Sequence, residues 1–561
     1  MGMKRRPEAL AADEHDLLII GGGITGACLA FDAATRGMRV ALVERDDFGG
    51  ATSASSSKLL HGGIRYLQQL RFGKARESAR ERLFFQNLAP HLTHYVPFVV
   101  PTFRGLAKSK PVLSAGMALY ETLCIGQTEL LLDRAQAVPP GRGLSVADVT
   151  AMIPGINGEG LTGGRLFHES HMVNSERMTL AFVEGAAAHG AVVANYVRAD
   201  EFLRDGDRVV GVAATDSETG QALNVRARAV VNAAGPWIRT LNEQLEMSSV
   251  GRVVTGFSRG AHMVTKPLTD GHAVALPTKR RAESVLDRGG RHVFIIPWRG
   301  HSLIGTSYAP HDGPLENMSP TPAEIGDLIE DINAALGEGT LTSADVRYAF
   351  AGLYPLTAEE IDPKVYQGSA DYQVVDHGAD DGIQGLFTVF GAKFTTARLL
   401  AERALDQIGP TLAGEWRDCQ TRGVALPSAP AAGDTVADQV LAESAVPQEM
   451  ADDLTVNYGS HAAAVAALAS EGDGLTTPLV AGSGAWGVDS VWAVREEMAR
   501  HLDDVVFRRT GLGTIGNPGE AVLRQVAELM AGELGWDAAT IESEIQATTG
   551  RFPAAASGAH Q

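Results

Sequence analysis

Cysteines, basic residues and long apolar runs are all scarce in this chain of 561 residues. Its three cysteines, Cys28, Cys124 and Cys419, lie far apart and form no C-x-x-C motif. This spacing argues against a disulfide framework or a thiolate metal site, and it favours a reducing compartment. Because 48 Lys and Arg residues face 67 Asp and Glu residues, the net charge is −19, and the chain lacks the basic face that a nucleic-acid partner requires.

No run of about 20 apolar residues occurs, so we expect no membrane-spanning helix, although a helix resting on a membrane surface stays open. The first residues include Lys4, Arg5 and Arg6 but no apolar segment behind them, and we expect no signal peptide. The composition, with 45% hydrophobic and 20% charged residues, is that of a globular protein. At about 150 residues per domain, the length allows roughly two to four folding units, and an enzyme is the default expectation.

A glycine-rich turn follows the first apolar run of the chain. Residues 16–20 (DLLII) are typical of a buried strand, and residues 21–26 (GGGITG) fit G-x-G-x-x-G. A helical stretch then leads to a second apolar run at residues 39–43. This β-α-β order predicts a dinucleotide site, with a purely structural glycine turn as the alternative.

The residues of this fingerprint have distinct predicted tasks. Gly21 permits the tight turn, Gly23 lets a pyrophosphate approach the backbone, and Gly26 allows the helix to pack closely on the strand. Glu44 closes the second strand, where its carboxylate can accept hydrogen bonds from ribose hydroxyls. Residues 511–516 (GLGTIG) repeat the string, but no buried strand precedes them, and we expect a loop there. With one fingerprint only, a flavoenzyme of this kind would take its electrons from a small substrate rather than from a nicotinamide.

Other segments predict further sheet and a helical tail. The expected strands lie at 191–197, 208–214 and 229–232, as an antiparallel layer, and at 261–265, 293–297 and 302–305, in a mixed sheet. We expect the last two to form a hairpin with a tight turn at Arg299 and Gly300. A stretch rich in Pro, Ala and Gly at 421–433 predicts a linker. Val491, Val494, Met498 and Leu502 place one apolar stripe on a helix, which we expect to pack against the rest of the protein.

Several longer motifs carry a family resemblance. They are GGGITGACLAFDAATRG from residue 21, ATSASSSKLLHGGIRYL from 51, VVNAAGPW from 230, FIIPW from 294, LIGT from 303 and FGAKFTTARLLAE from 390. Together they resemble the FAD-dependent glycerol-3-phosphate dehydrogenase family of the aerobic, quinone-linked type. YGSHAAAV from residue 458 and VWAVREEMARHLDDVVFRRT from 491 are similar to the C-terminal helical domain of that family. The resemblance covers nearly the whole chain in the right order.

The resemblance implies an α/β fold with an FAD-binding Rossmann-like domain of the glutathione-reductase type, an antiparallel-sheet substrate domain and an all-helical C-terminal domain. The expected bounds are 12–75, 160–255 and 365–412 for the discontinuous FAD-binding domain, 76–159 and 256–364 for the substrate or cap domain, 413–434 for the linker and 435–552 for the helical domain.

The implied activity is oxidation of sn-glycerol 3-phosphate to dihydroxyacetone phosphate, with hydride transfer to flavin N5. The catalytic positions would be Arg65, Tyr66, His262 and Lys393. His262 could act as a general base or hydroxyl partner, and Lys393 could stabilise charge on the reduced flavin or polarise the substrate. Without the resemblance, His262 fits a core histidine and Lys393 a solvated surface lysine.

Cofactor contacts are implied at ten positions. These are Gly21, Gly23, Gly26, Glu44, Ser56, Ser57, Lys58, Gly235, Gly391 and Thr395. The residues of the 51–58 segment would otherwise form a plain polar turn.

The chain departs from the family pattern where a substrate phosphate is expected. Tyr354 and Ala370 stand where the family has arginines, whose guanidinium groups suit a phosphate. Losing two such contacts of roughly 1.5–3 kcal/mol each would weaken phosphate binding by about two to four decades unless Arg65, Arg259 or Lys58 compensates. Ala392 for a glycine and Ala397 for a tyrosine indicate a reshaped pocket. Two alternatives therefore stay open: the same chemistry on another polyol, polyol phosphate or hydroxy acid, and a flavin-binding protein without turnover.

The expected partners are a small alcohol or polyol phosphate and a quinone or other electron acceptor. The resemblance implies a cytoplasmic protein, with peripheral contact to the cytoplasmic membrane face and a homodimer both left open.

Overall fold

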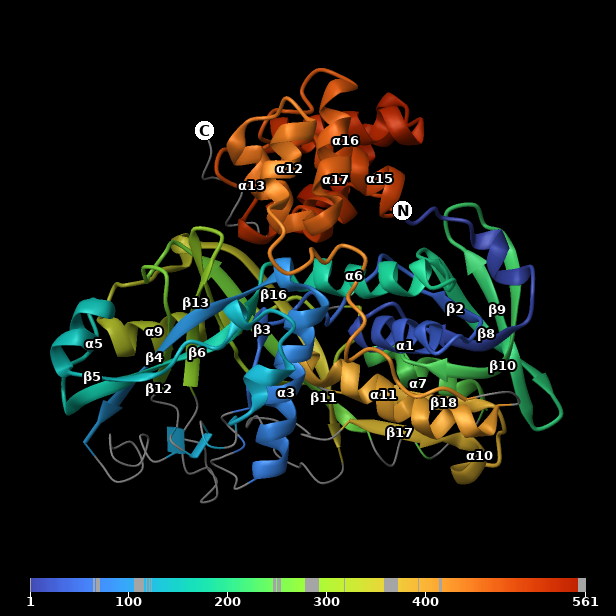
Figure 1. The fold of residues 1–561 in the computed structure, drawn as a ribbon, viewed down its shortest axis with the longest axis horizontal. Coiled ribbons are helices and arrows are strands. Elements are labelled where there is room, and N and C mark those ends of the chain that lie inside the picture. Colours follow the sequence, from blue (N-terminus) through green and yellow to red (C-terminus); the bar gives the residue numbers. More distant parts are fainter. Residues whose placement is uncertain are drawn as a thin grey trace.

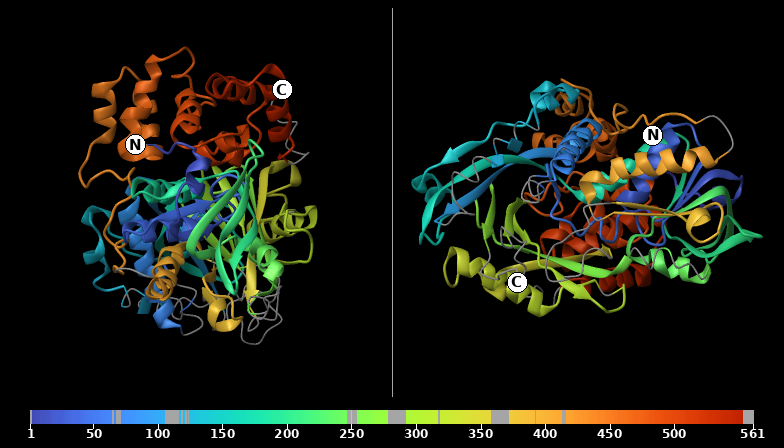
Figure 2. Two further views of the ribbon diagram at one scale, coloured as in Figure 1. Left: turned by 90° about the vertical axis from the view of Figure 1, so that its right-hand side faces the viewer. Right: turned by 90° about the horizontal axis from the view of Figure 1, so that it is seen from below.

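The computed structural model describes residues 2–63, 66, 71–104, 116–117, 119–120, 122, 124–245, 249, 254–277, 292–316, 318–357, 372–391, 393–412 and 416–552. Two β-sheets lie side by side, and the C-terminal helices gather at one end of the molecule above them (Figures 1 and 2). Helix α6 (Ser175–Ala188) runs between those C-terminal helices and the first sheet (Figure 1).

The first sheet is mainly parallel and contains the predicted β-α-β unit. Its strand order is β17 (Gln373–Asp376), β18 (Leu386–Phe390), β10 (Ala222–Asn232), β1 (His15–Ile20), β2 (Val40–Val43) and β7 (Val192–Ala194). Strands β1 and β2 pair in parallel and are almost wholly buried, which explains their continuous apolar runs. Helix α1 (Ile24–Thr35) packs against α6 and against α11 (Ala397–Ile408). The predicted β-α-β unit is confirmed.

The predicted antiparallel layer is present only in part, because two of its three expected strands pair otherwise: residues 192–194 form β7, which is parallel to β2, and residues 229–232 at the end of β10 are parallel to β1. Strands β8 (Val197–Asp205) and β9 (Arg208–Asp216) pair with each other and then with the first half of β10. The turn between β9 and β10 closes where the Gly220 amide donates to the Asp216 carbonyl at 2.8 Å.

The second sheet is larger and lies beside the first (Figure 1). Its order is β15 (Ala309–His311), β11 (Val254–Thr265), β14 (His301–Gly305), β13 (His292–Trp298), β12 (Ala273–Pro277), β4 (Thr93–Phe103), β6 (Leu161–Met172) and β3 (Leu59–Leu60), with β16 (Val346–Thr357) on β11 and β5 (Arg142–Leu144) on β6. The predicted hairpin of β13 and β14 is confirmed, and its turn residues Arg299 and Gly300 both have positive φ.

One domain boundary differs from its prediction. Residue 160 is the expected start of the second FAD-binding segment, yet β6 begins at Leu161 and pairs with β4 along nearly its whole length. Strand β3, also placed in the first domain, pairs with β6. Strands β3 and β6 therefore belong to the second sheet, because their hydrogen-bonded partners lie in it. The second segment of the first domain begins with α6 instead.

The remaining helices divide between the sheets and the C-terminal part. Around the sheets lie α3 (Phe72–Leu88), α5 (Val146–Met152), α7 (Ile238–Asn242), α9 (Pro322–Leu336) and α10 (His377–Asp380). The C-terminal part holds α12 (Val436–Glu443), α13 (Gln448–Tyr458), α14 (Ala462–Ala467), α15 (Gly487–Glu496), α16 (Glu520–Leu534) and α17 (Ala538–Thr549). Within the described ranges, none of the helices has the length and apolar character needed to cross a bilayer.

Two C-terminal predictions have different outcomes. The second glycine string forms only a 3₁₀ turn at Leu512–Ile515 and follows no strand, as expected of a loop. The apolar stripe, in contrast, does not lie on one helix. Helix α15 ends at Glu496, and Met498 adopts a positive φ of 58° and packs into the core of the first sheet.

Candidate active site

A cavity of about 1330 Å³ extends from the first sheet to the second. At one end it reaches the carboxyl ends of β1 and β2, and at the other it reaches His262 on β11 and Tyr354 on β16. The carboxyl ends of parallel strands are where such sheets bind their ligands, and the volume exceeds that of an ordinary small-molecule pocket. The cavity has room for a dinucleotide together with a small substrate.

The fingerprint glycines shape the first end of this cavity. Gly21 has a φ of +106°, and a Cβ there would lie 2.7 Å from the Ala233 carbonyl oxygen. A Cβ on Gly23 would meet only the Ser53 hydroxyl, at 3.1 Å, so the space above this residue is open. Gly21 and Gly23 line the cavity, whereas Gly26 does not, because its hydrogen atoms face the Gly21 carbonyl, 1.8 Å from where a Cβ would stand. Gly26 thus has the packing task, and the other two leave room for a pyrophosphate at the start of α1.

Glu44 lines the cavity at the end of β2. Its carboxylate accepts hydrogen bonds from the backbone amides of Gly22 at 2.6 Å and Asp46 at 2.9 Å. Burial raises the pKa of Glu44 to about 7, against the lowering effect of these two amides. The two amides fix the direction of the carboxyl group, and its ionised form, which predominates above about pH 7, can accept hydrogen bonds from hydroxyl donors.

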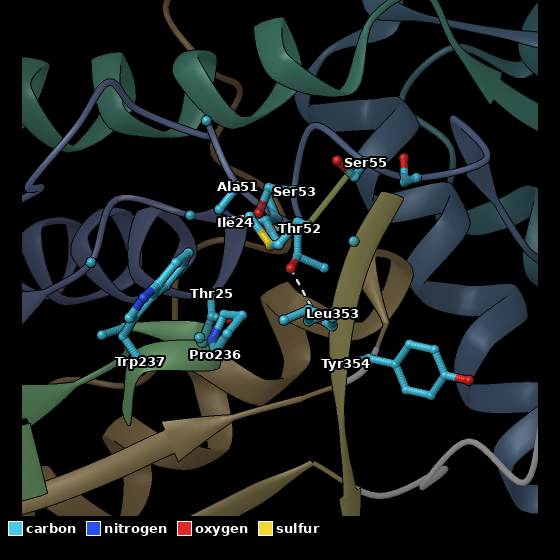
Figure 3. Close-up of a pocket in the computed structure, with 18 of the residues that line it drawn as sticks. Ile24, Thr25, Ala51, Thr52, Ser53, Ser55, Pro236, Trp237, Leu353 and Tyr354 are labelled. Atoms are coloured by element: carbon cyan, nitrogen blue, oxygen red, sulfur yellow. Dashed lines mark hydrogen bonds between the residues drawn. The ribbon is translucent and has the colours of Figure 1, made fainter. Parts of the chain in front are cut away.

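The loop after β2 forms the middle of the cavity wall (Figure 3). Ser56 and Ser57, two of the expected cofactor contacts, line the cavity. Thr52 donates a hydrogen bond to the Leu353 carbonyl at 2.8 Å, which joins the loop to β16 (Figure 3). Ser53 has a task that the sequence did not single out. Its Oγ accepts the Ile24 amide at 2.9 Å, at the first turn of α1.

Lys58 has a different position from the one predicted for a cofactor ligand. Its side chain is not part of the cavity wall, and its ammonium donates to both Glu176 carboxylate oxygens at 2.7 Å and to Ser175 Oγ at 2.9 Å. The Lys58 backbone has a φ of 56°, which is rare for a residue with a side chain. The lysine is thus committed to a buried ion pair behind the loop.

His262 lies at the substrate end and is 4% exposed. Its Nε2 is 2.8 Å from Ser57 Oγ, and its ring stacks on Phe350 with centroids 5.2 Å apart. Burial, with a smaller contribution from the charge of Lys58, lowers the pKa of His262 to about 3. The imidazole is therefore neutral at physiological pH.

Lys393, Tyr66 and Tyr354 also line the substrate end. The Lys393 ammonium lies 4.0 Å from the centroid of the Tyr66 ring, in a cation–π arrangement. Tyr354 stands edge-on to Tyr308, with centroids 6.2 Å apart. In Figure 3 its phenol points away from Trp237 and Pro236, which lie on the other side of the view.

Three further predicted contacts line the cavity. They are Gly235, with a φ of +55°, Gly391 and Thr395, whose Oγ1 accepts the His61 amide at 3.1 Å. Trp237, two residues after Gly235, was not predicted to have a role, yet the centroid of its ring lies 3.8 Å from the Arg45 guanidinium, and both residues line the cavity.

Arg259 does not compensate for the missing family arginines in the way expected. Its guanidinium binds Glu324 through two contacts, Nε to Oε1 at 3.0 Å and Nη2 to Oε2 at 2.9 Å, and it does not line the cavity. Arg65, Ala370 and Ala392 lie outside the described residues. Within the described part of the chain, no group of three or more His, Cys, Asp or Glu side chains is arranged to hold a metal ion.

Comparisons with known proteins agree over nearly the whole chain. Residues 16–407 match the family model described as FAD dependent oxidoreductase, and residues 419–541 match the one described as C-terminal domain of alpha-glycerophosphate oxidase. A glycerol-3-phosphate dehydrogenase of Mycobacterium leprae is 34% identical over 98% of this chain and 89% of its own length. Glycerol-3-phosphate dehydrogenase 2 of Mycobacterium tuberculosis is 34% identical over 96% and 88%.

A solved structure is similar over the same extent. The glycerol-3-phosphate dehydrogenase of Bacillus halodurans, crystallised in complex with FAD, superposes with a TM-score of 0.75 at 26% identity, covering 97% of this chain and 95% of the other.

Proposed function

The chain belongs to the FAD-dependent glycerol-3-phosphate dehydrogenase family, and we propose that it oxidises sn-glycerol 3-phosphate to dihydroxyacetone phosphate. The fold class, FAD as cofactor and a dehydrogenase activity on a CH–OH donor, all expected from the motifs, are confirmed. The observation that carries the proposed reaction is the continuity of the cavity, which joins the glycine cradle to His262 and Lys393. An alcohol bound near His262 and Lys393 would therefore lie in the same cavity as the cofactor.

The cradle fits FAD in its chemistry. Gly21 and Gly23 leave the backbone open at the start of α1 for a pyrophosphate, and Glu44 offers its carboxylate to ribose hydroxyls. Ser56, Ser57, Gly235, Gly391 and Thr395 line the continuation of the cavity towards the substrate end. Bound there, FAD supplies the two-electron acceptor for the hydride removed from the alcohol carbon.

His262 is the proposed acceptor for the hydroxyl proton. Because its imidazole is neutral, Nε2 can accept a hydrogen bond from the substrate hydroxyl, directly or through Ser57 Oγ, which lies 2.8 Å away. The low pKa makes His262 a weak base, so it takes the proton only as the hydride leaves. Stacking on Phe350 holds the ring in one orientation, so the accepting atom stays at the cavity wall. Removal of the hydroxyl proton makes hydride departure from the same carbon easier.

Lys393 is the proposed source of positive charge at the same end. Its ammonium, held against the Tyr66 ring, can stabilise negative charge that develops during the reaction or polarise the substrate oxygen. Arg65 is a further proposed substrate contact, one residue before Tyr66.

Anaerobic mixing of the oxidised holoprotein with glycerol 3-phosphate tests this function. We expect the visible absorbance of the oxidised flavin to disappear as its ring is reduced, together with formation of dihydroxyacetone phosphate. If glycerol 3-phosphate leaves the flavin oxidised at all concentrations while the protein is fully loaded, the proposed reaction is wrong.

A second candidate is the same oxidation of another polyol, polyol phosphate or hydroxy acid. Tyr354 in place of an arginine favours it, as does the pairing of Arg259 with Glu324. The same anaerobic assay, run with unphosphorylated alcohols and hydroxy acids beside their phosphates, distinguishes the two candidates by which compound bleaches the flavin. A protein that binds FAD but is bleached by none of them would support the third alternative, a flavin-binding protein without turnover.

We also propose that the electrons leave to a quinone or another non-nicotinamide acceptor, that the protein works on the cytoplasmic face of a membrane through peripheral contact, and that it forms a homodimer. The single dinucleotide fingerprint supports the first of these proposals. Reduction of a soluble quinone by the substrate-reduced protein, co-sedimentation with lipid vesicles and light scattering test the three in turn.

A further inference from the structure

The loop that forms the middle of the cavity wall is held at both ends by buried charges. We take this loop as residues 47–58; Thr52, Ser53, Ser56 and Ser57 are among its cavity-lining members. Asp47, at its start, is 1% exposed, and Lys58, at its end, is also 1% exposed. A charge buried to this degree is tolerated only when it has partners.

The partners of Asp47 come mainly from the C-terminal helical part. Arg508 Nε donates to Asp47 at 2.6 Å, and Arg509 donates through Nη1 at 2.7 Å and Nη2 at 3.0 Å. Asn195 adds a fourth donor at 3.0 Å. Burial alone would raise the pKa of Asp47, but the charges of Arg509 and Arg508 outweigh it and lower the pKa.

Arg508 and Arg509 are themselves fixed within their domain. Both end the π-helical turn Asp504–Arg509, where Arg508 binds Asp504 and Arg509 donates to the Glu497 carbonyl at 2.8 Å. Arg508 also reaches the cavity wall beside Asp47. Arg508 is one of several C-terminal residues in the cavity wall, and both guanidinium groups reach the start of the loop at Asp47.

The other end of the loop connects to the same network through α6. Glu176 receives Lys58, and the next residue, Arg177, donates to Glu497 at 2.8 Å. Helix α6 lies between the C-terminal helices and the first sheet (Figure 1), so its first turn joins the end of the loop to the C-terminal domain. The start of loop 47–58 is thus bound directly by the helical domain, and its end is bound by Glu176 on α6, next to the residue through which α6 binds that domain.

We propose that the C-terminal helical domain is a positioning element for the cofactor: Arg508 and Arg509, acting through Asp47, hold loop 47–58 in the shape that lines the FAD site. Neither arginine needs to touch FAD for this effect, because Ser53 on the loop holds the Ile24 amide at the start of α1 and Ser57 holds His262. When the anchor is removed, the loop gains alternative conformations, and FAD must then order it on binding. The inference depends on FAD binding alone and not on the identity of the substrate.

Release of FAD from the full-length holoprotein tests the inference, measured as the rise of free-flavin fluorescence after dilution. For Arg509→Met we expect release at least tenfold faster than in the wild type, and for Arg509→Lys, which keeps the charge but not the two-atom contact, an intermediate rate. Arg524→Met is the matched control. Arg524 lies in the same domain in exposed ion pairs with Glu520 and Glu542, and its loss leaves the release rate unchanged.

A merely structural role gives a different pattern. In that case Arg509→Met lowers the melting temperature while folded molecules release FAD at the wild-type rate and show the wild-type visible circular dichroism of the flavin. That result would overturn the inference. If Arg509→Met does not fold, Arg509→Lys and Arg508→Lys decide by the same two readouts. Because no substrate is added, a protein inactive on glycerol 3-phosphate still gives a clear answer.

Discussion

The Nε2 atom of His262 lies 2.8 Å from Oγ of Ser57, although the two residues are 205 positions apart in the sequence. One belongs to the second sheet and the other to the loop after β2, so this contact joins the proposed proton acceptor to the cofactor-binding wall. The contact forms only when the two halves of the cavity are correctly apposed. This hydrogen bond therefore both orients the imidazole of His262 and holds the loop after β2 against the second sheet.

His262→Asn removes the proposed proton acceptor and leaves an amide of smaller size. We expect the rate of anaerobic flavin reduction by the substrate to fall by about 10²- to 10⁴-fold, the range typical of a lost general base. FAD content stays at the wild-type level, because His262 is not among the predicted cofactor contacts. Ser57→Ala is the companion variant, for which we expect a smaller loss. Wild-type reduction rates in His262→Asn would contradict the assigned role.

Glu44 predicts how FAD affinity depends on pH. Its pKa in the folded protein is about 7, because burial disfavours the carboxylate, whereas its ordinary value is 4.5. Ribose hydroxyls donate to the ionised form, so we expect the FAD dissociation constant to fall, by up to about tenfold per pH unit, as the pH rises from about 5 to 7. Fluorescence titration of the apoprotein measures this. In Glu44→Gln the dependence disappears, and an equal slope in both proteins would exclude Glu44 as its origin.

The same residue sets a trend in the stability of the apoprotein. A folded-state pKa above the unfolded one means that the fold favours the protonated carboxyl. Its contribution is full below about pH 4.5 and is lost as the pH rises through about 7. The difference in melting temperature between wild-type apoprotein and Glu44→Gln is therefore expected to grow in favour of the glutamine variant over this interval.

Two glycine variants separate cofactor binding from folding. At Gly23 a side chain would meet only the Ser53 hydroxyl, so we expect Gly23→Val to fold and to be colourless, because the methyl groups fill the space for the pyrophosphate. At Gly26 a Cβ would stand 1.8 Å from the Gly21 carbonyl oxygen, so Gly26→Val is expected to disrupt the packing of α1 on β1 and to reduce soluble yield. Far-UV circular dichroism and flavin absorbance of the purified proteins check both. A yellow Gly23→Val protein would contradict the placement of FAD.

Local patterns predicted much of this architecture. The turn at Gly21–Gly26 and the β13–β14 hairpin depend on residues close in sequence, and both are present. The antiparallel layer was predicted only in part, because residues 192–194 and 229–232 pair in parallel with distant strands. The task of Gly26 in helix packing was also predicted from the motif alone.

Long-range charge pairing could not be predicted in the same way. Lys58 looked like a cofactor ligand within a polar loop, but its partner Glu176 is 118 positions away. The expected apolar stripe ends at Glu496, where the next residue, Glu497, binds Arg177 on α6. Strand β6, which was expected in the first domain, belongs to the second sheet because it pairs with β4. Each of these outcomes depends on which distant segment packs against the residue in question. Local patterns in a single sequence do not reveal such long-range neighbours.

Tyr354 provides the sharpest test of substrate preference. It lines the cavity where the family has an arginine, and one of the predicted substitutes, Arg259, is bound to Glu324. A guanidinium restored at this position can form charge-assisted hydrogen bonds to a phosphate, worth roughly 1.5–3 kcal/mol, or about 10- to 150-fold in affinity. If a phosphate binds beside this strand, Tyr354→Arg lowers the KM for glycerol 3-phosphate by at least tenfold, and adding Ala370→Arg lowers it further. Tyr354→Phe removes the hydroxyl without adding charge, and so separates the effect of losing the hydroxyl from the effect of gaining a guanidinium.

An unchanged or higher KM in the arginine variants means that the phosphate lies elsewhere in the cavity. A better rate with an unphosphorylated alcohol in the wild type, lost in Tyr354→Arg, would instead identify Tyr354 as the residue that selects a neutral substrate.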